Sequence, residues 1–335
     1  MRKGCLIIIC CLLICSFINV ASGKTIYVDD SGGKDYTSIQ DAIDNATVGD
    51  IIYVYTGTYQ ESIKINKTIE LVGENPETTI INGLEEWATI RFSDNSNGSS
   101  LEGFMIKNSC PLDPTTGISI VSSSIQIYNN IIVDCGDGIS ITGDSAKIFQ
   151  NVIKENSGEG ISTGSRSEIF ENDFLDNGEA ILILFSVNNS IHNNNIENNS
   201  QGIELKGSYN TISDNEVKNN EEYGILVDYE YNIISNNTVE DNEKGIYVIS
   251  FADFSQIFKN TISNNKYGIY LGKTYSGQSS NSNNISNNTF SNNNYDIYDV
   301  SNPPKKNGET PGFELIFVII GIALVLLCKR RKMKL

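Results

Sequence analysis

The chain has 335 residues, of which 39% are hydrophobic and 19% are charged, and its formal net charge is −17 at pH 7. A chain with this apolar fraction can bury a substantial core, which excludes a disordered protein in spite of the many Asn, Ser and Gly residues. An acidic surface repels other polyanions, so a nucleic-acid partner is excluded as well.

Residues 1–23 have the layout of a secretory signal peptide, in which a basic start precedes the apolar run Leu6–Val20 and small residues end the segment. We expect cleavage before Lys24, with an uncleaved N-terminal anchor as the alternative. The distribution of the cysteines is also consistent with an exported protein. Only Cys110 and Cys135 lie between the two hydrophobic ends of the chain, and they could form one disulfide.

Residues 24–82 are predicted to form an N-terminal cap and the first coils of a longer structure. Thr25–Val28 alternates like a strand, and the capping box Thr37–Gln40 opens a short helix that runs to about Asn45. The helix would cover a strand edge and core side chains that an open end exposes. Further strands are predicted over Asp50–Tyr55, Ser62–Ile65 and Thr68–Gly73.

Residues 83–300 are predicted to form the repeats of a solenoid, because from Gly117 onward the sequence repeats at about 22 residues. Each repeat opens with a small residue and continues with alternating apolar positions, the pattern of a strand with one buried face. No helical stripe is present, so the predicted fold is an all-β, right-handed parallel β-helix. The repeats open at Gly117, Gly138, Gly160, Ala180, Gly202, Gly224, Gly245 and Gly268.

An Asn recurs at a constant offset within each repeat. If the coils rise by one strand spacing of about 4.8 Å, equivalent Asn side chains lie above one another, and each amide can donate to the next carbonyl oxygen. The alternative is that Asn only tolerates turns. The predicted ladder consists of Asn130, Asn151, Asn172, Asn194, Asn215, Asn237, Asn260 and Asn288. A second series starts at Cys135 and continues through Asn156, Asn177, Asn199, Asn220, Asn242, Asn265 and Asn293.

Residues 301–312 are predicted to be a linker, and residues 313–335 a C-terminal hydrophobic anchor with a basic tail. The apolar run Leu315–Cys328 is followed by five Lys and Arg residues, which the positive-inside rule keeps in the cytoplasm. This pattern predicts a transmembrane helix that holds the protein at the outer face of the cell membrane. A buried helix is the alternative, because the run is short for a span.

Three stretches resemble known families. Asp35–Ile43, Gly57–Tyr59 and Thr79–Gly83 are similar to the start of pectin methylesterases and of many β-helix surface proteins. The repeats resemble the NosD and carbohydrate-binding sugar-hydrolase group, which is pectate-lyase-like in fold. This resemblance implies the fold and leaves the chemistry open.

The tail also carries a resemblance. Pro311, Gly312 and Phe313 before an apolar segment and a basic end resemble the PGF-CTERM sorting signal of archaeal surface proteins, although Glu314 departs from the pattern. The resemblance implies processing by an archaeosortase and anchoring by a lipid.

The search for catalytic residues yields no complete set. The only histidine is His192, which we interpret as a solvated turn residue, whereas polygalacturonases need a His with clustered Asp residues. Lys206 with Glu204 and Asp228 is the one neighbourhood where a base and carboxylates coincide, as the calcium-dependent lyases require. We therefore predict no catalytic residues, and whether the protein is an enzyme stays open, with the balance against it.

Metal ligands are equally sparse. The NosD resemblance implies copper, yet the body offers one His, Met105 and two distant Cys, so we predict no metal site and no cofactor. Calcium is the remaining alternative, since acidic turn residues provide oxygen ligands, but no calcium-loop spacing is present. These acidic residues are Asp173, Asp176, Glu179, Asp214, Glu216, Glu221, Glu222, Glu240, Asp241 and Glu243.

Aromatic residues form the most suggestive surface feature. The outward position of the first strand in each repeat changes from Ser in the early coils to Tyr247, Tyr270 and Tyr298 in the last ones. Tyr209, Tyr231 and Tyr275 lie in the loops that follow. Exposed aromatics in a row can bind sugar rings, which makes these six tyrosines the predicted ligand-binding residues, or they can simply pack on one another.

The function expected from these patterns is that of a non-catalytic surface protein that binds an envelope glycan or a surface-layer component. A polysaccharide-active lyase, hydrolase or epimerase is the alternative. Export also predicts N-glycosylation at Asn-x-Ser/Thr sequons. The acceptors are Asn45, Asn66, Asn97, Asn188, Asn198, Asn236, Asn284 and Asn287.

Overall fold

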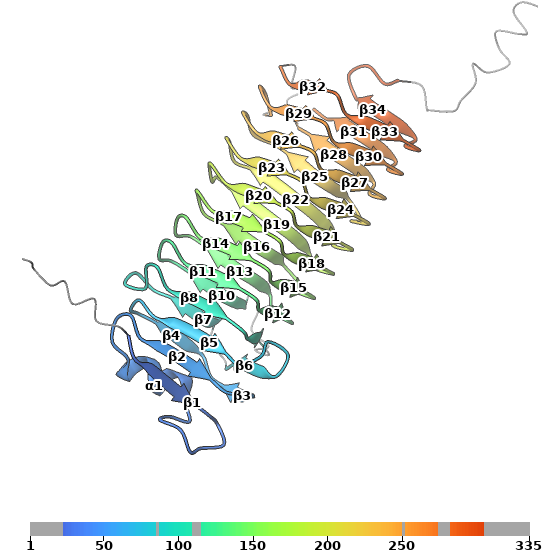
Figure 1. Ribbon diagram of the computed structural model, residues 1–335. Helices are drawn as coiled ribbons and strands as arrows, with labels where there is room; N and C mark the ends of the chain where they lie inside the picture. Colours follow the sequence, from blue (N-terminus) through green and yellow to red (C-terminus); the bar gives the residue numbers. More distant parts are fainter. Residues whose placement is uncertain (1–22, 85–86, 109–114, 250–251, 274–281, 305–335) are drawn as a thin grey trace, which may run out of the picture.

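The computed structural model describes residues 23–84, 87–108, 115–249, 252–273 and 282–304. In this part the chain winds into about 11 stacked coils, each of which adds one strand to each of three long parallel sheets (Figure 1). Equivalent residues in successive coils lie 21 to 23 residues apart over most of the solenoid. The predicted parallel β-helix is confirmed.

The three sheets are named here in the order in which the chain visits them. Sheet A consists of β1 (Thr25–Val28), β2 (Ile51–Val54), β5 (Glu70–Gly73), β8 (Ser100–Glu102), β11 (Gln126–Tyr128), β14 (Lys147–Phe149), β17 (Glu168–Phe170), β20 (Ser190–His192), β23 (Thr211–Ser213), β26 (Ile233–Ser235), β29 (Gln256–Phe258) and β32 (Asn284–Ser286). Sheet B consists of β3 (Gly57–Gln60), β6 (Thr79–Gly83), β9 (Met105–Asn108), β12 (Ile131–Val133), β15 (Val152–Lys154), β18 (Asp173–Leu175), β21 (Asn195–Glu197), β24 (Glu216–Lys218), β27 (Thr238–Glu240), β30 (Thr261–Ser263) and β33 (Thr289–Ser291). Sheet C consists of β4 (Ile63–Ile65), β7 (Ala88–Phe92), β10 (Thr116–Ile120), β13 (Asp137–Ile141), β16 (Glu159–Thr163), β19 (Glu179–Leu184), β22 (Gln201–Lys206), β25 (Tyr223–Val227), β28 (Lys244–Val248), β31 (Tyr267–Leu271) and β34 (Tyr295–Asp299).

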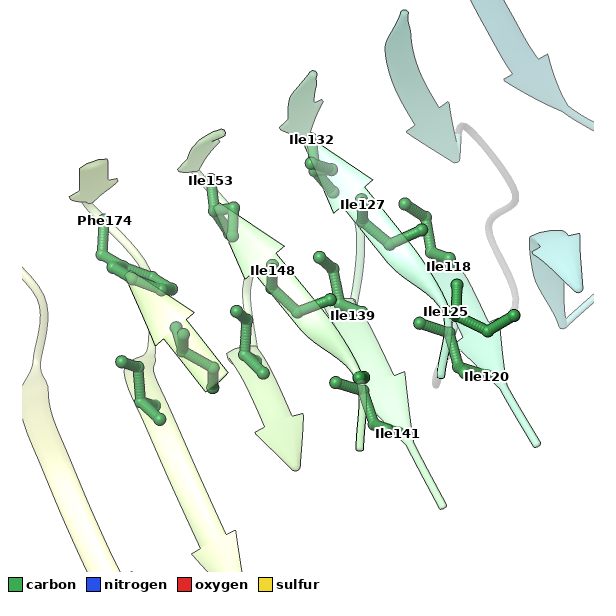
Figure 2. Close-up of a cluster of buried hydrophobic side chains, with 14 of the residues drawn as sticks. Ile118, Ile120, Ile125, Ile127, Ile132, Ile139, Ile141, Ile148, Ile153 and Phe174 are labelled. Carbon is green, nitrogen blue, oxygen red and sulfur yellow. The ribbon is translucent and has the colours of Figure 1, made fainter. Parts of the chain in front are cut away.

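The core is a set of aliphatic columns that run along the solenoid axis. Figure 2 shows Ile118 of sheet C, Ile127 of sheet A and Ile132 of sheet B pointing into the same interior, and all three are fully buried. Each such side chain contributes about 1.5 to 3 kcal/mol relative to an exposed one. The column from sheet C contains Ile118, Ile139, Ile161, Ile181, Ile203, Ile225, Ile246 and Ile269.

Both predicted Asn ladders are present. The backbone N–H and Nδ2 of Asn194 donate to Oδ1 of Asn215 at 3.0 and 2.9 Å, and Asn215 repeats both bonds to Asn237 at 3.0 Å. In the second ladder the backbone N–H of Cys135 donates to Oδ1 of Asn156 at 3.1 Å. The same side chains also donate to backbone carbonyl oxygens of the preceding coil. The ladders therefore satisfy the buried hydrogen-bonding groups of the turns between the sheets.

A third ladder was not predicted. Asn189 donates through Nδ2 to Oδ1 of Asn210 at 3.0 Å, and Asn210 donates to Asn232 at 3.2 Å. It is shorter than the other two because Ser167 and Ser255 occupy the positions on either side. Each turn between sheets A, B and C in the central coils therefore has its own row of buried polar side chains.

The helix α1 (Ile39–Asn45) covers the first coil, with Ile39, Ala42 and Ile43 buried against it. The predicted capping box is wrong by one residue. Ser38 is the N-cap and accepts from the backbone N–H of Asp41, while the Glu61 carboxylate accepts from two further N–H groups of the first turn. A carboxylate from the next coil thus takes the place of the predicted Gln40 side chain.

Several predicted features lie outside the described residues: 1–22 of the signal peptide, Cys110 of the disulfide, the sorting motif and the hydrophobic tail. No helix within the described ranges is long and apolar enough to cross a membrane. These features therefore stay predictions. The sheets themselves continue without a break across the predicted boundary at residue 82, because β6 pairs with β9 and β5 with β8.

The sequon asparagines separate cleanly from the ladder asparagines. All eight predicted acceptors are exposed in the structure, whereas ladder residues such as Asn215 and Asn237 are at most 2% exposed. A glycosylating enzyme can reach the first group only. We expect protein purified from its native host to carry glycans at several of the eight sites, seen as extra mass on intact-protein and peptide mass spectrometry. An unmodified mass would contradict this expectation.

Candidate functional site

The outer face of sheet C carries the predicted tyrosine column. Tyr247, Tyr270 and Tyr298 are aligned in register on β28, β31 and β34, and all three are half-buried. The predicted series of outward residues in the earlier coils is aligned in the same way. It runs from Ser119 through Ser140, Ser162, Leu182, Glu204 and Leu226 to Tyr247.

Two tyrosines missed by the sequence analysis complete this surface. Tyr267 and Tyr295 lie in register with each other, and their ring centroids are 5.5 Å apart. Tyr267 also contacts Tyr270 at 5.1 Å and Tyr298 at 4.9 Å, both edge to face. We call Tyr247, Tyr267, Tyr270, Tyr295 and Tyr298 the tyrosine cluster. Lys244 lies 5.3 Å from the Tyr247 ring centroid, close enough for a cation–π contact.

The other predicted tyrosines form a separate group at the turn between sheets C and A. Tyr209 and Tyr231 stack at 5.0 Å, and Phe254 continues the stack at 5.2 Å from Tyr231. All three have a φ near +60°, which is unfavourable for a bulky side chain, and all three are exposed. Tyr275 lies outside the described residues. Among the described rings, no contact joins this stack to the tyrosine cluster.

Carboxylates gather on the same face of sheet C, two to three coils before the tyrosine cluster. Glu204 is only 8% exposed and is aligned between Leu182 and Leu226, which exclude water on both sides. Its Oε1 pairs with Nζ of Lys206 at 2.8 Å. Asp228 follows β25, and its pKa is raised by burial and by the charge of Glu204. Lys206, Glu204 and Asp228 therefore lie close together in the structure, as predicted.

Glu179 is the residue that the sequence analysis placed incorrectly. It was predicted as a solvated turn residue, but it begins β19 on the outer face of sheet C and is only 9% exposed. Its carboxyl is hydrogen-bonded to the Glu204 side chain on the adjacent strand. Burial, followed by the negative charges of Glu204 and Glu159, raises the pKa of Glu179 to about 9. At neutral pH this carboxyl is protonated.

Tyr223 connects the carboxylates with the tyrosine cluster. It is 4% exposed, its hydroxyl donates to Oε1 of Gln201 at 2.9 Å, and its ring centroid is 6.5 Å from that of Tyr247. Burial and the charges of Glu179 and Glu204 raise the pKa of its phenol. The outer face of sheet C thus carries buried carboxyls, leucines and tyrosines in neighbouring coils from β19 to β34.

The interpretation of His192 was also wrong. It is the last residue of β20 and stacks on Phe170 at 5.2 Å, extending a row of outward rings that begins with Tyr128 and Phe149 on sheet A. Its Nε2 lies 3.4 Å from Oε1 of Glu168. The histidine is therefore a packed strand residue on a different sheet from the carboxylates of sheet C.

Two family models match the chain. One described as "Right handed beta helix region" matches residues 137–280, and one described as "Periplasmic copper-binding protein (NosD)" matches residues 18–208. Among curated proteins, a "Cell surface glycoprotein" of Methanothermus fervidus is 34% identical over 132 residues. That match covers 38% of this chain and 21% of the relative, so the chain spans about a fifth of the relative's length.

Solved structures of similar fold include carbohydrate-active proteins. An alginate lyase from Paenibacillus sp. str. FPU-7 has a TM-score of 0.59 at 16% identity, covering 79% of this chain and 99% of the lyase. XylC in complex with xylose has a TM-score of 0.63 at 13% identity, covering 72% and 69%. The mannuronan C-5 epimerase AlgE4 A-module of Azotobacter vinelandii has a TM-score of 0.54 at 16% identity, covering 77% and 91%. These likenesses establish the fold alone.

The described residues do not fit a copper site. Copper prefers imidazole, thiolate and thioether ligands. His192 lies on sheet A, Met105 on sheet B, and Cys135 is buried beside the second ladder, and no three metal-binding side chains gather within the described ranges. The carboxylates of sheet C offer no such group for calcium either. Because the match to residues 18–208 covers more than half of its length, the chain belongs to the family described as "Periplasmic copper-binding protein (NosD)", as a member whose described residues lack a copper donor set.

Proposed function

We propose that this chain is a cell-surface β-helix protein that binds a neutral glycan along the tyrosine cluster. The observation that carries the proposal is the mutual contact of five half-buried tyrosines on one flat, regular sheet face. Aromatic rings bind the apolar faces of sugars, while phenol hydroxyls can bond to sugar hydroxyls.

Charge favours a neutral glycan over an acidic one. Without the five basic residues that follow Leu315–Cys328, Arg2, Lys3 and Glu314, the chain has 17 basic and 40 acidic residues, a net charge of −23. A polyuronate or a sulfated chain would be repelled by this field. We therefore expect a polymer of uncharged sugars.

The location in this proposal is the outer surface of the cell. It is supported by the similarity to a cell surface glycoprotein and by the predicted signal peptide at residues 1–23. The anchor would be residues 313–335, either as a membrane span or as a sorting signal that an archaeosortase exchanges for a lipid.

Binding to a glycan array by the full-length protein, followed by titration with the best neutral oligosaccharide, tests the proposal. The double variant Tyr247→Ala with Tyr270→Ala removes two rings of the tyrosine cluster and should weaken binding about tenfold or more. Phe149→Ala is the matched control, because Phe149 stacks between two outward rings on sheet A at 4.9 Å from each. Equal affinity of wild type and double variant, or equal losses in both variants, would refute the proposed binding face.

A further inference from the structure

The exposed stack of Tyr209, Tyr231 and Phe254 begins in the coil that directly follows a predicted glycosylation site. The three rings occupy one column in the turn between sheets C and A, because each lies two residues before a residue of sheet A that is paired with the next coil. In the preceding coils the same column holds smaller or charged residues. Its members are Ser124, Ser145, Arg166, Asn188, Tyr209, Tyr231 and Phe254, and each has a φ of 59° or 60°.

The backbone conformation of this column suits asparagine better than a bulky ring. A left-handed φ is unfavourable for large side chains, whereas Asn adopts it readily. The rings are also exposed, Tyr209 by 55% and Phe254 by 51%. The stack therefore combines a strained backbone with apolar surface in contact with water. Both costs are offset where the rings have a binding partner outside the polypeptide.

One face of the Tyr209 ring is open toward Asn188. The rings of Tyr209 and Tyr231 stack with their centroids 5.0 Å apart and an interplanar angle of 4°, so Tyr231 covers the face toward the following coil. The opposite face is directed toward the preceding coil, where the equivalent residue is Asn188. Asn188 is exposed, and its φ matches that of Tyr209 to within 1°. Because the two turns stack, their Cα–Cβ bonds leave the backbone in parallel, about 4.8 Å apart.

We propose that the partner of this stack is the protein's own glycan on Asn188, whose first sugar stacks on the open face of Tyr209. Asn188, Asn189 and Ser190 form the sequon. The inference rests on the glycosylation expected of an exported chain and is independent of glycan binding by the tyrosine cluster. In the modification, Nδ2 of Asn188 bonds to the anomeric carbon of the sugar, the bond from that carbon to a phosphate oxygen of a lipid-linked donor breaks, and the amide releases one proton.

A sugar at this position has the chemistry that the open ring face requires. One face of a pyranose ring consists of C–H groups with a partial positive charge, and the face of an aromatic ring is negative. The spacing between coils, about 4.8 Å, is also a separation at which two rings stack. The hydroxyl groups at the edge of the sugar stay in water. The sugar therefore covers apolar surface of Tyr209 without burying its own polar groups.

Asn198 is a matched sequon that lacks a ring in the next coil. Asn198, Asn199 and Ser200 repeat the sequence Asn-Asn-Ser, and Asn198 is exposed with a φ of 59°. The middle residue of each sequon, Asn189 or Asn199, belongs to an Asn ladder. In the coil that follows Asn198, the equivalent residue is Asn219. The two sites therefore differ in whether a sugar finds an aromatic ring to stack on.

Hydroxyl-radical footprinting of the full-length glycoprotein from its native host tests the inference, with occupancy of each sequon measured by peptide mass spectrometry. Ser190→Ala and Ser200→Ala remove the two sequons and keep both asparagines. The oxidation rate of Tyr209 should rise about twofold or more in Ser190→Ala, because the sugar no longer covers its one open face. The rate should stay at the wild-type value in Ser200→Ala. Phe254, at the far end of the stack, should react equally in all three proteins.

Thermal melts provide a second readout. Ser190→Ala should melt about 2 °C or more below Ser200→Ala, because it loses the contact between sugar and ring. The difference should vanish when both variants also carry Tyr209→Ser, a residue that the column holds at Ser124 and Ser145. A difference that persists without the ring would mean that the glycan at Asn188 stabilises the protein without Tyr209, and the inference would be wrong.

The other outcomes are equally decisive. An unmodified Asn188 overturns the inference, and so does a modified Asn188 with equal Tyr209 oxidation in wild type and Ser190→Ala. Binding of added neutral glycans to the tyrosine cluster should be the same in Ser190→Ala as in wild type. Failure of either proposal therefore leaves the other standing.

Discussion

Replacing Asn215 by leucine is expected to lower the free energy of unfolding by about 4 kcal/mol, because Asn215 satisfies several buried groups at once. Its Nδ2 donates to the carbonyl oxygens of Ile191 and Ser213 and to Oδ1 of Asn237, each at 3.0 Å. Its Oδ1 accepts two bonds from Asn194. Leucine would leave these partners buried and unpaired, and denaturant melts followed by circular dichroism measure the loss.

A matched Asn→Leu control lies one coil earlier. Asn195 is half-buried on the outer face of β21, its Nδ2 donates to Oδ1 of Asp173 at 3.3 Å, and its own Oδ1 is buried without a partner among the described residues. Asn195→Leu leaves no buried partner unpaired and removes an unsatisfied oxygen, so it should not lower the free energy of unfolding by more than about 0.5 kcal/mol. Asn219 is a poorer control, because its φ of 55° adds about 1 kcal/mol to any leucine substitution. Equal effects at Asn215 and Asn195 would show that the ladder does not stabilise the fold.

The ladders illustrate what the sequence predicts well. An Asn that returns every coil can be recognised from spacing alone, because parallel stacking places identical offsets above one another. The third ladder escaped notice because Ser167 and Ser255 interrupt it. The N-cap of α1 was misplaced because Thr37 and Ser38 are both good N-cap residues, with Gln40 and Asp41 three positions further on. The carboxylate of Glu61 comes from the following coil, and no local pattern predicts that contact.

The candidate site was only half predicted, and the reason is a break in alternation at the opening of each sheet C strand. Ile269 is fully buried, yet a Cβ on the preceding Gly268 would also point inward, 3.2 Å from Phe290. Two successive inward positions place the residue before the glycine on the outer face, where strict alternation would bury it. Tyr267 and Glu179 each directly precede the small residue that opens a repeat. Strict alternation would therefore place both in the wrong position, and the sequence analysis did not predict that they lie on the outer face.

Glutamine at position 179 is expected to stabilise the protein at neutral and alkaline pH. Folded Glu179 keeps its proton up to a pKa of about 9, whereas the unfolded side chain releases it near 4.5. The contribution of this proton to the free energy of unfolding is therefore fully present below about pH 4.5. It falls by about 1.4 kcal/mol per pH unit as the pH rises toward 9. The wild type should lose on the order of 3 kcal/mol through this group between pH 4.5 and pH 7.

Glu179→Gln removes this slope, because the amide carries no proton to lose and its Nε2 can donate to the nearby Glu204 carboxylate. Other titrating groups, including Asp228 with its own raised pKa, remain in both proteins and largely cancel in the comparison. Urea melts between pH 4 and pH 9 should give curves that coincide at acidic pH and diverge steadily above pH 5, with the variant more stable. Glu216→Gln, at an exposed carboxyl, should follow the wild type throughout. Parallel curves for wild type and Glu179→Gln would mean that Glu179 ionises normally in the folded protein.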